Sequence, residues 1–322
     1  MTSVTVRTPA KINLALMVDP PRADGYHPLA TVYQAVSLFD HVTAQPAADG
    51  QLTLELVSDD QPQAVLDLPT DDQNLALRAA RLLARHTGAG QGARLRLRKA
   101  IPVAGGMAGG SSDAAAALVA CDALWQTAVP AEELRVLAAD LGSDVPFCLL
   151  GGTAIGSGRG ELVSPALTLG RYHWVVAVAD EGLPTAAVYA ELDRLRADPS
   201  EQGRRHQRGG LGQVSGRADL AVPRPLMNAL RTGDAAALGR ALENELQPAA
   251  LSLRPGLSEL LNVARACGAL GAMVSGSGPT CVFLANDEAH ALDIGVGLTS
   301  AGGCRTVHRV VGPVLGARRV SG

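Results

Sequence analysis

Residues 102–117 read PVAGGMAGGSSDAAAA, a glycine-rich loop that runs into an alanine-rich segment. Four glycines lie within six positions, and two serines follow them. Glycine permits positive φ angles and lets an anion approach the backbone closely. The alanine run predicts a helix, whose first turn points N–H groups and a positive dipole end at the loop. We therefore predict a binding site for a di- or triphosphate at this loop.

Two common phosphate-binding motifs do not describe this loop. The pattern GxxxxGK[ST] is absent, and no ribose-binding acid stands where a dinucleotide fingerprint requires one. The hydroxyl groups of Ser111 and Ser112 can donate to phosphate oxygens or ligate Mg²⁺. A turn that merely joins a strand to a helix is the alternative interpretation, although such a turn needs fewer glycines and no serines.

The composition predicts a folded globular protein. The chain has 322 residues, which favours one large domain or two packed domains. Apolar residues make up 47% and charged residues 18%, so a substantial core can form. The formal net charge of −3 shows no basic footprint for nucleic acid. Only Lys11 and Lys99 are lysines among the 28 lysines and arginines, and no function is evident for Lys99.

We expect a cytoplasmic protein without a targeting segment. The N-terminal residues MTSVTVRTPAKINLALMV lack the cationic and long apolar regions of a signal peptide. No continuous apolar stretch is long enough for a transmembrane helix. The five cysteines include no CxxC pair, which predicts reduced thiols and argues against a zinc site.

Apolar periodicity predicts an α+β fold, in which strands and helices mix without strict alternation. Strands are expected over residues 4–6, 12–16, 52–56, 93–98, 174–179, 280–284 and 305–311. Helices are expected over 74–86, from the alanine run to about 125, and over 130–142, 185–196, 225–244, 255–267 and up to 299. Residues 197–219 are rich in Gly, Arg, Ser and Gln and predict a surface insertion, with an RNA-binding segment as the alternative.

The loop also resembles a known family. Pro102 to Ala114 is similar to the central motif of the GHMP kinases (galactokinase, homoserine kinase, mevalonate kinase and phosphomevalonate kinase). TPAKINLAL at 8–16 resembles the N-terminal motif of this family, and SGSGPTCVFL at 275–284 resembles its C-terminal glycine-rich motif. The resemblance implies an ATP-dependent, Mg²⁺-requiring kinase. Residues 1–162 would form an ATP-binding domain like ribosomal protein S5 domain 2, and residues 163–322 a ferredoxin-like substrate-binding domain.

Narrower motifs resemble the GHMP kinases whose substrate is cytidine-diphosphate methylerythritol. These motifs are PAKINL (9–14), DGYH (24–27), NLALRAARLL (74–83), GSDVPFCLLGGTAIGSGRGE (142–161) and LPTAAVY (183–189). They imply phosphorylation of the substrate 2-hydroxyl group in the non-mevalonate (MEP) isoprenoid pathway. We expect a monomer or a homodimer. A homoserine- or mevalonate-type kinase and a non-catalytic nucleotide-binding sensor are the alternatives.

Within this resemblance, Lys11 and Asp144 match the catalytic pair. Asp144 would accept the proton of the substrate alcohol, and Lys11 would stabilise charge on the γ-phosphate. Taken without the family, Asp144 is an acid at a helix N-terminus and Lys11 is a surface lysine at a strand start. The two residues lie far apart in sequence, so only the fold could bring them together.

The resemblance also implies an ATP site with Ser111 as the candidate Mg²⁺ ligand. Its residues would be Pro102, Gly105, Gly106, Met107, Ala108, Gly109, Gly110, Ser111, Ser112 and Asn74. A helix cap explains Asn74 equally well. Asp113 departs from the neutral residue expected after the two serines, and we expect it to face away from the nucleotide or to touch the adenine side.

The substrate would be held by a further group of residues. Tyr26 and His27 would bind the cytidine base by stacking and hydrogen bonding, although alone DGYH is only a turn. Asn13 shares a strand face with Lys11, and Thr185 and Tyr189 share a helix face that would close the pocket. The supporting loop would consist of Ser275, Gly276, Ser277 and Gly278.

Overall fold

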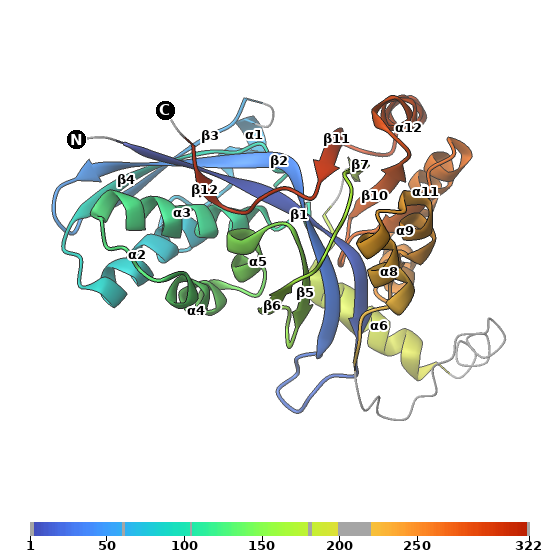
Figure 1. The fold of residues 1–322 in the computed structure, drawn as a ribbon, viewed down its shortest axis with the longest axis horizontal. Coiled ribbons are helices and arrows are strands. Elements are labelled where there is room, and N and C mark those ends of the chain that lie inside the picture. Colours follow the sequence, from blue (N-terminus) through green and yellow to red (C-terminus); the bar gives the residue numbers. More distant parts are fainter. Residues whose placement is uncertain (1–2, 60–61, 104, 180–181, 199–219, 321–322) are drawn as a thin grey trace. The chain divides into compact units, whose positions relative to one another are not determined.

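The computed structural model describes residues 3–59, 62–103, 105–179, 182–198 and 220–320. The predicted insertion at 197–219 therefore lies, from residue 199 on, outside the described residues. The chain forms two compact units (Figure 1). Unit 1 comprises residues 1–12, 33–171 and 310–322, and unit 2 comprises residues 13–32 and 172–309.

These units differ from the contiguous domains 1–162 and 163–322 that the sequence led us to expect. The first two strands, β1 (Val4–Val18) and β2 (Leu29–Ala47), each contribute residues to both units. The C-terminal residues 310–322 return to unit 1, where β12 (Arg318–Arg319) pairs with β1. Such pairing joins segments from opposite ends of the chain, which no local pattern reveals. The division into an ATP-binding and a substrate-binding domain stays a prediction.

The sheet of unit 1 follows the order β12-β1-β2-β4-β3. Its further strands are β3 (Leu52–Val57), β4 (Gly92–Arg98), β5 (Thr153–Ser157), which pairs with β2, and β6 (Leu162–Pro165), which pairs with β5. In β4, Ala93, Leu95 and Leu97 are buried, whereas the arginines between them are exposed. This period-2 alternation confirms the predicted strand and shows which side of β4 faces the core.

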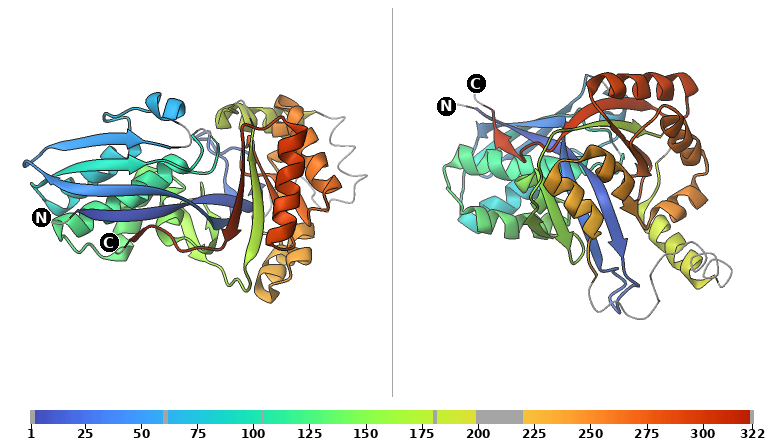
Figure 2. Two further views of the ribbon diagram at one scale, coloured as in Figure 1. Left: turned by 90° about the horizontal axis from the view of Figure 1, so that it is seen from above. Right: turned by 45° about the vertical axis from the view of Figure 1, so that its right-hand side comes forward.

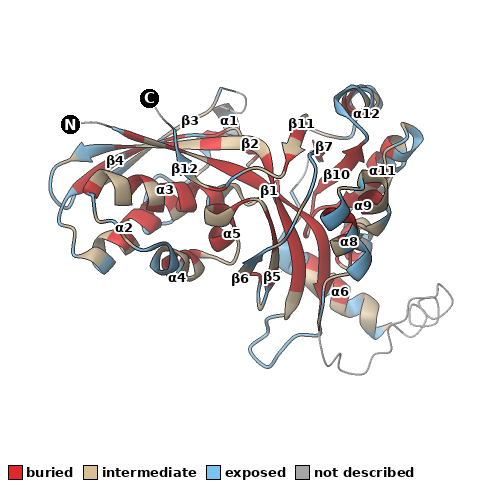
Figure 3. Cartoon of the chain, in the orientation of Figure 1, coloured by how far each residue is buried: buried red, intermediate tan, exposed pale blue. Residues whose placement is uncertain are grey.

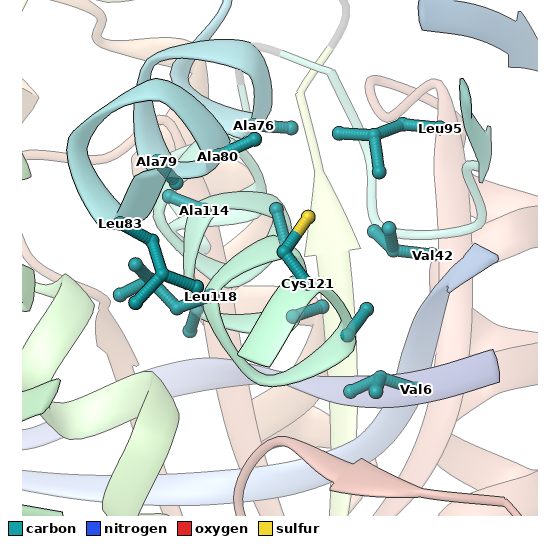
Figure 4. Close-up of a cluster of buried hydrophobic side chains, with 14 of the residues drawn as sticks. Val6, Val42, Ala76, Ala79, Ala80, Leu83, Leu95, Ala114, Leu118 and Cys121 are labelled. Carbon is teal, nitrogen blue, oxygen red and sulfur yellow. The ribbon is translucent and has the colours of Figure 1, made fainter. Parts of the chain in front are cut away.

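The helices of unit 1 are α1 (Pro62–Leu66), α2 (Leu75–Thr87), α3 (Gly109–Trp125), α4 (Ala131–Leu141) and α5 (Val145–Leu150). Helix α2 ends at Gly88, whose left-handed φ of 69° is the common conformation of a glycine that terminates a helix. Helix α3 is buried along most of its length (Figure 3). Its alanines let α2 and the strands pack closely around it, and Leu83, Leu95 and Leu118 fill this core (Figure 4).

The sheet of unit 2 has the order β11-β7-β10-β9, and β10 pairs antiparallel with both neighbours. Its strands are β7 (Tyr172–Val178), β9 (Gly271–Val274), β10 (Thr280–Ala285) and β11 (Thr306–Gly312), of which β11 belongs to unit 2 only up to Arg309. The sequence WVVAVA predicts β7 correctly, and its apolar residues are buried. A separate short strand, β8 (Glu243–Asn244), pairs in parallel with β1 at Ala15 and Leu16.

The helices of unit 2 are α6 (Thr185–Ala197), α8 (Arg224–Thr232), α9 (Ala235–Ala241), α10 (Gln247–Leu253), α11 (Gly256–Ala266) and α12 (Glu288–Ala301). Helices α9 to α12 pack against the four-stranded sheet (Figure 2). Val175 and Ala177 of β7 and Phe283 of β10 lie in the resulting core. None of the helices in the described part of the chain is long and apolar enough to cross a membrane.

The expectation of one helix over 225–244 is wrong. Gly233 takes a left-handed φ of 74° and ends α8. Asp234 then caps α9, because its carboxylate accepts a hydrogen bond from the Ala237 N–H group. The chain leaves the helix after Ala241 and forms β8. Gly233 thus ends one helix and Asp234 begins the next. Apolar residues with helical spacing on both sides of this pair had suggested one continuous helix.

A close approach in unit 2 gives a test of this packing. A Cβ atom on Gly239 of α9 would lie 2.2 Å from the carbonyl oxygen of Leu270, just before β9. We predict that Gly239→Ala lowers the free energy of unfolding by about 1–3 kcal/mol, because backbone must shift to admit the methyl group. Urea unfolding measures the change.

Gly256 provides the matched control, since a Cβ atom there meets no atom within 4 Å. Gly256→Ala should leave stability unchanged or raise it by up to about 1 kcal/mol. Equal losses of stability in the two variants would contradict the close approach of α9 to β9.

Candidate active site

The backbone of Lys11 connects β1 to the glycine-rich loop within unit 1. The Lys11 N–H group donates to the carbonyl oxygen of Met107 at 3.2 Å. The Met107 side chain is buried and holds this part of the loop in the core. Because the hydrogen bond is between backbones, the position of Lys11 relative to the loop does not depend on a flexible side chain.

The side chain of Lys11 reaches Asp144, as the family resemblance implies. Its Nζ atom lies 3.6 Å from Oδ2 of Asp144 and 5.4 Å from the centre of the Tyr33 ring. The Lys11 side chain is only 8% exposed, compared with 29% for Asp144. A buried ammonium group is costly unless it is paired, so the carboxylate and the aromatic face stabilise Lys11 in this position.

Asp144 stands immediately before α5, where an acid could simply cap the helix. Its backbone is helical, with φ −85° and ψ −14°, and its carboxylate makes no capping hydrogen bond within the described residues. The carboxylate is instead paired with Lys11. The capping interpretation of Asp144 therefore does not account for its side chain.

The glycine-rich loop ends at the N-terminus of α3. Ala108 is the residue before the helix and has a left-handed φ of 60°, and Gly106 has φ 71°. Ala108 carries no polar side chain that could cap the helix, so the first N–H groups of α3 remain suited to an anion. Gly110 is exposed at this end and Ser111 is partly exposed, whereas Pro102 and Gly105 are buried.

Ser112 differs from its neighbour Ser111. It is fully buried, and its hydroxyl group donates to the carbonyl oxygen of Pro9 at 2.7 Å. The same oxygen lies 3.3 Å from Sγ of Cys148 in α5. Burial raises the pKa of this thiol to about 12, against the smaller lowering effect of the Ser112 hydrogen bond, so Cys148 stays protonated near neutral pH. Ser112 therefore ties α3 to β1 two residues before Lys11.

Asn74 is the N-cap of α2. Its Oδ1 atom accepts a hydrogen bond from the Ala76 N–H group at 2.9 Å, and its Nδ2 group donates to the Pro69 carbonyl oxygen at 2.8 Å. Both ends of the amide thus stabilise local structure, which confirms the capping interpretation. A contact with adenine stays a prediction.

In unit 2, the DGYH motif lies against α6. The His27 Nε2 group donates to the Asp193 carboxylate, with both oxygens at 3.1 Å, and the His27 ring centre is 4.9 Å from that of Tyr189. Tyr26 is 55% exposed. Asp24 accepts a hydrogen bond from the Tyr26 N–H group, which is the main reason why the Asp24 pKa is lowered. The motif therefore combines an exposed tyrosine with an imidazole that is oriented by Asp193.

Residues 275–278 form a glycine-containing turn in unit 2. Gly276 and Gly278 have φ angles of 59° and 79°, which only glycine adopts without strain. Ser275 accepts a hydrogen bond from the Asn13 N–H group at 3.0 Å, and Ser277 lies 3.0 Å from the Thr185 hydroxyl oxygen. The turn thus contacts two of the segments expected to bind the substrate.

The side chain of Asn13 is buried, although the family resemblance implies that it contacts the substrate. It is 2% exposed, and its Nδ2 group donates to Thr31 Oγ1 at 2.7 Å. Thr31 in turn donates to the Ala15 carbonyl oxygen. Asn13 therefore joins β1 to β2 in addition to any contact with a substrate.

Asn244 holds the 275–278 turn, although no motif in the sequence points to it. Its Nδ2 group donates to the carbonyl oxygens of Val274 and Gly276 at 2.7 and 2.8 Å. Its Oδ1 atom accepts a hydrogen bond from the Leu246 N–H group at 2.9 Å. A single asparagine between two glutamates has no spacing that distinguishes it, so no local signal could have found it. Asp193, which orients His27, likewise belongs to no recognisable motif.

The structure thus groups the predicted residues within each unit. Lys11, Asp144 and the glycine-rich loop lie together in unit 1. His27, Tyr189, Thr185 and the 275–278 turn are linked in unit 2. Among the residues that the structure describes, no three His, Cys, Asp or Glu side chains gather into a group that could hold a metal ion.

Comparison with known proteins agrees with this arrangement. The family model described as GHMP kinases N terminal domain matches residues 74–152, and GHMP kinases C terminal matches residues 226–303. A 4-diphosphocytidyl-2-C-methyl-D-erythritol kinase of Thermobifida fusca (strain YX) is 53% identical over 319 residues, which cover 98% of each chain.

Solved structures show the same fold. The crystal structure of a 4-(cytidine 5'-diphospho)-2C-methyl-D-erythritol kinase matches with a TM-score of 0.74 and 33% identity, over 95% of this chain and 98% of that chain. Homoserine kinase from Cytophaga hutchinsonii has a TM-score of 0.73 at 19% identity, over 99% and 98% of the two chains. The second similarity shows the fold alone.

The contacts of Asn244 give a prediction about the 275–278 turn. Asn244→Ala removes the hydrogen bonds to Gly276 within the turn and to Val274 directly before it, so the Ser275 and Gly278 amides should exchange with solvent at least about tenfold faster. Hydrogen–deuterium exchange followed by mass spectrometry measures this. Asn228→Ala, an exposed asparagine of α8, is the matched control and should leave exchange at the turn unchanged. Equal protection in both variants would show that Asn244 does not hold the turn.

Proposed function

Because the chain belongs to the GHMP kinases, in the family of the 4-diphosphocytidyl-2-C-methyl-D-erythritol kinases, we propose that it phosphorylates the 2-hydroxyl group of that substrate. The phosphoryl donor is ATP. The observation that carries the proposal is the Lys11–Asp144 pair, whose Nζ and Oδ2 atoms lie 3.6 Å apart. The Lys11 backbone in β1 is also hydrogen-bonded to the glycine-rich loop. We also propose that the enzyme is cytoplasmic, belongs to the non-mevalonate pathway and is a monomer or a homodimer.

Asp144 acts as the general base in this mechanism. Its carboxylate takes the proton of the 2-hydroxyl group while the oxygen attacks the γ-phosphorus of ATP. The new O–P bond forms as the bond between the γ-phosphorus and the bridging oxygen breaks, and ADP leaves with that oxygen. The adjacent Lys11 ammonium stabilises the negative charge of the transferred group.

The glycine-rich loop holds the phosphates. The N–H groups at the start of α3 and the backbone around Gly105, Gly106, Gly109 and Gly110 bind the phosphate oxygens, and the positive end of the helix dipole attracts their charge. We propose Ser111 as the protein ligand of Mg²⁺, which would neutralise phosphate charge. Phosphate and water oxygens supply most ligands of such an ion, so a carboxylate cluster is not required. Ser112 positions β1.

The residues of unit 2 bind the cytidine group. Tyr26 offers an exposed ring on which a pyrimidine can stack, and Asp193 and Tyr189 hold the His27 imidazole in place. The contact between His27 and Tyr189 joins the DGYH and LPTAAVY motifs, which are the stretches that favour a cytidine substrate over homoserine or mevalonate.

An ATP-consumption assay tests this function. The purified protein is supplied with MgATP and, separately, with 4-diphosphocytidyl-2-C-methyl-D-erythritol, mevalonate, homoserine and galactose. We expect ADP release with the first acceptor only. Release with another acceptor would contradict the cytidine assignment. A protein that binds ATP and releases no ADP with any acceptor would be a sensor rather than a kinase.

The role of Asp144 gives a separate prediction. Asp144→Asn should lower kcat by about 10²–10⁴-fold, because the amide cannot accept the proton, while the KM for ATP changes less than about threefold. Steady-state kinetics measures both constants. Asp140→Asn, an exposed acid of α4, is the matched control and should keep wild-type rates. A large loss of ATP binding in Asp144→Asn would mean that Asp144 holds the nucleotide or the fold instead.

A further inference from the structure

Three charged side chains form a buried cluster in unit 1 that the mechanism does not use. The Lys99 Nζ group donates to Oδ2 of Asp113 at 2.7 Å and also to Oδ2 of Asp40. The side chains of Lys99, Asp40 and Asp113 are 3%, 0% and 6% exposed. Burying charges is costly, and a structure keeps such a group only where its members are paired.

The cluster joins the two ends of the glycine-rich loop. Asp40, in β2, accepts hydrogen bonds through Oδ1 from the N–H groups of Ala100 and Ile101, at 2.6 and 2.9 Å. These two residues lead into the loop. Asp113 lies in α3, by which the chain leaves the loop. Lys99 therefore bridges an acid that holds the entrance of the loop and an acid that belongs to its exit helix.

Lys99 also lies close to the phosphate-binding end of α3. A Cβ atom on Gly109, the first residue of the helix, would be 3.2 Å from Lys99 Nζ. The Asp113 carboxylate is buried and paired with Lys99, and its orientation relative to the nucleotide stays a prediction. Its second oxygen, Oδ1, is buried without a hydrogen-bond partner among the described residues.

The charges of the cluster must be balanced for an anion to bind nearby. Burial lowers the pKa of Lys99, but Asp113 and Asp40 outweigh it, so the net shift is upward. The Lys99 ammonium group therefore offsets negative charge that Asp40 and Asp113 would otherwise place beside the loop.

We propose that Lys99 is a positioning residue for the nucleotide. It holds the two ends of the glycine-rich loop together, and its ammonium group prevents the buried acids from repelling the bound phosphates. This inference rests on the proposed function, because it takes the loop to hold the phosphates of ATP. Lys99 itself is buried and acts through the loop rather than by contact with the nucleotide.

Three variants of the full chain separate charge from structure. Lys99→Met removes the ammonium group and leaves both acids, so the Kd for MgATP should rise at least about tenfold while the KM for the alcohol acceptor stays within about threefold. Asp113→Asn keeps an oxygen that can accept from Lys99, so its Kd should stay within about threefold of wild type or fall. The double variant Lys99→Met/Asp113→Asn should recover most of the affinity, because one uncompensated acid is gone.

Isothermal titration calorimetry with MgATP measures the affinities, and thermal unfolding is recorded for each variant. Arg96→Met is the matched control. Arg96 belongs to β4 and pairs at the surface with Glu55 at 3.7 Å, so its loss should leave the Kd unchanged. A merely structural role for Lys99 would lower the melting temperature of the double variant without restoring its affinity.

Each outcome decides the proposal. Wild-type affinity in Lys99→Met, or a double variant that binds no better than Lys99→Met, overturns it. If Lys99→Met does not fold, Asp113→Asn alone decides, since a weakening beyond about threefold contradicts the charge argument. A wild-type protein that neither binds nor consumes MgATP would overturn the proposed function. If the wild-type protein is an active kinase and all variants share its Kd for MgATP, only the role of Lys99 is overturned.

Discussion

The packing of the first turn of α3 against β1 is the contact on which the geometry of unit 1 depends. Two hydrogen bonds maintain it, from the Lys11 N–H group to Met107 and from the Ser112 hydroxyl group to Pro9. The small side chains of α3 allow this approach, and larger ones would separate the helix from the strand. The same contact places Lys11 beside the N-terminal end of α3, which attracts anions. The packing of α3 on β1 therefore also brings together the groups that would bind phosphate.

The two lysines of the chain share an environment that its arginines do not. Both are buried in unit 1, and each is paired with acids, Lys11 with Asp144 and Lys99 with Asp40 and Asp113. Lysine is a compact point charge, whereas arginine is a planar fork that needs more room and several acceptors. The described arginines that form ion pairs do so at exposed or partly exposed positions. The scarcity of lysine therefore marks the sites where a compact cation must fit within the interior.

In unit 2, side-chain hydrogen bonds hold the 275–278 turn and the His27 ring in place. Its turn at 275–278 takes backbone angles that glycine permits, and the side chains of Asn244, Ser275 and Thr185 hold that turn in place. The His27 ring is likewise oriented by Asp193 rather than by its own motif. In both cases a polar side chain from a distant segment removes the freedom that a short loop would otherwise keep.

Local chemistry was sufficient for much of this protein. The glycine-rich loop, the helix that ends at Gly88 and the alternation in β4 follow from neighbouring residues, because φ preferences and periodicity act over a few positions. The pairing of Lys11 with Asp144, the Asp40–Lys99–Asp113 cluster and the clamp by Asn244 needed the tertiary structure. Each joins residues that lie far apart in sequence, and only the burial of apolar surface in a shared core brings such groups within hydrogen-bonding distance.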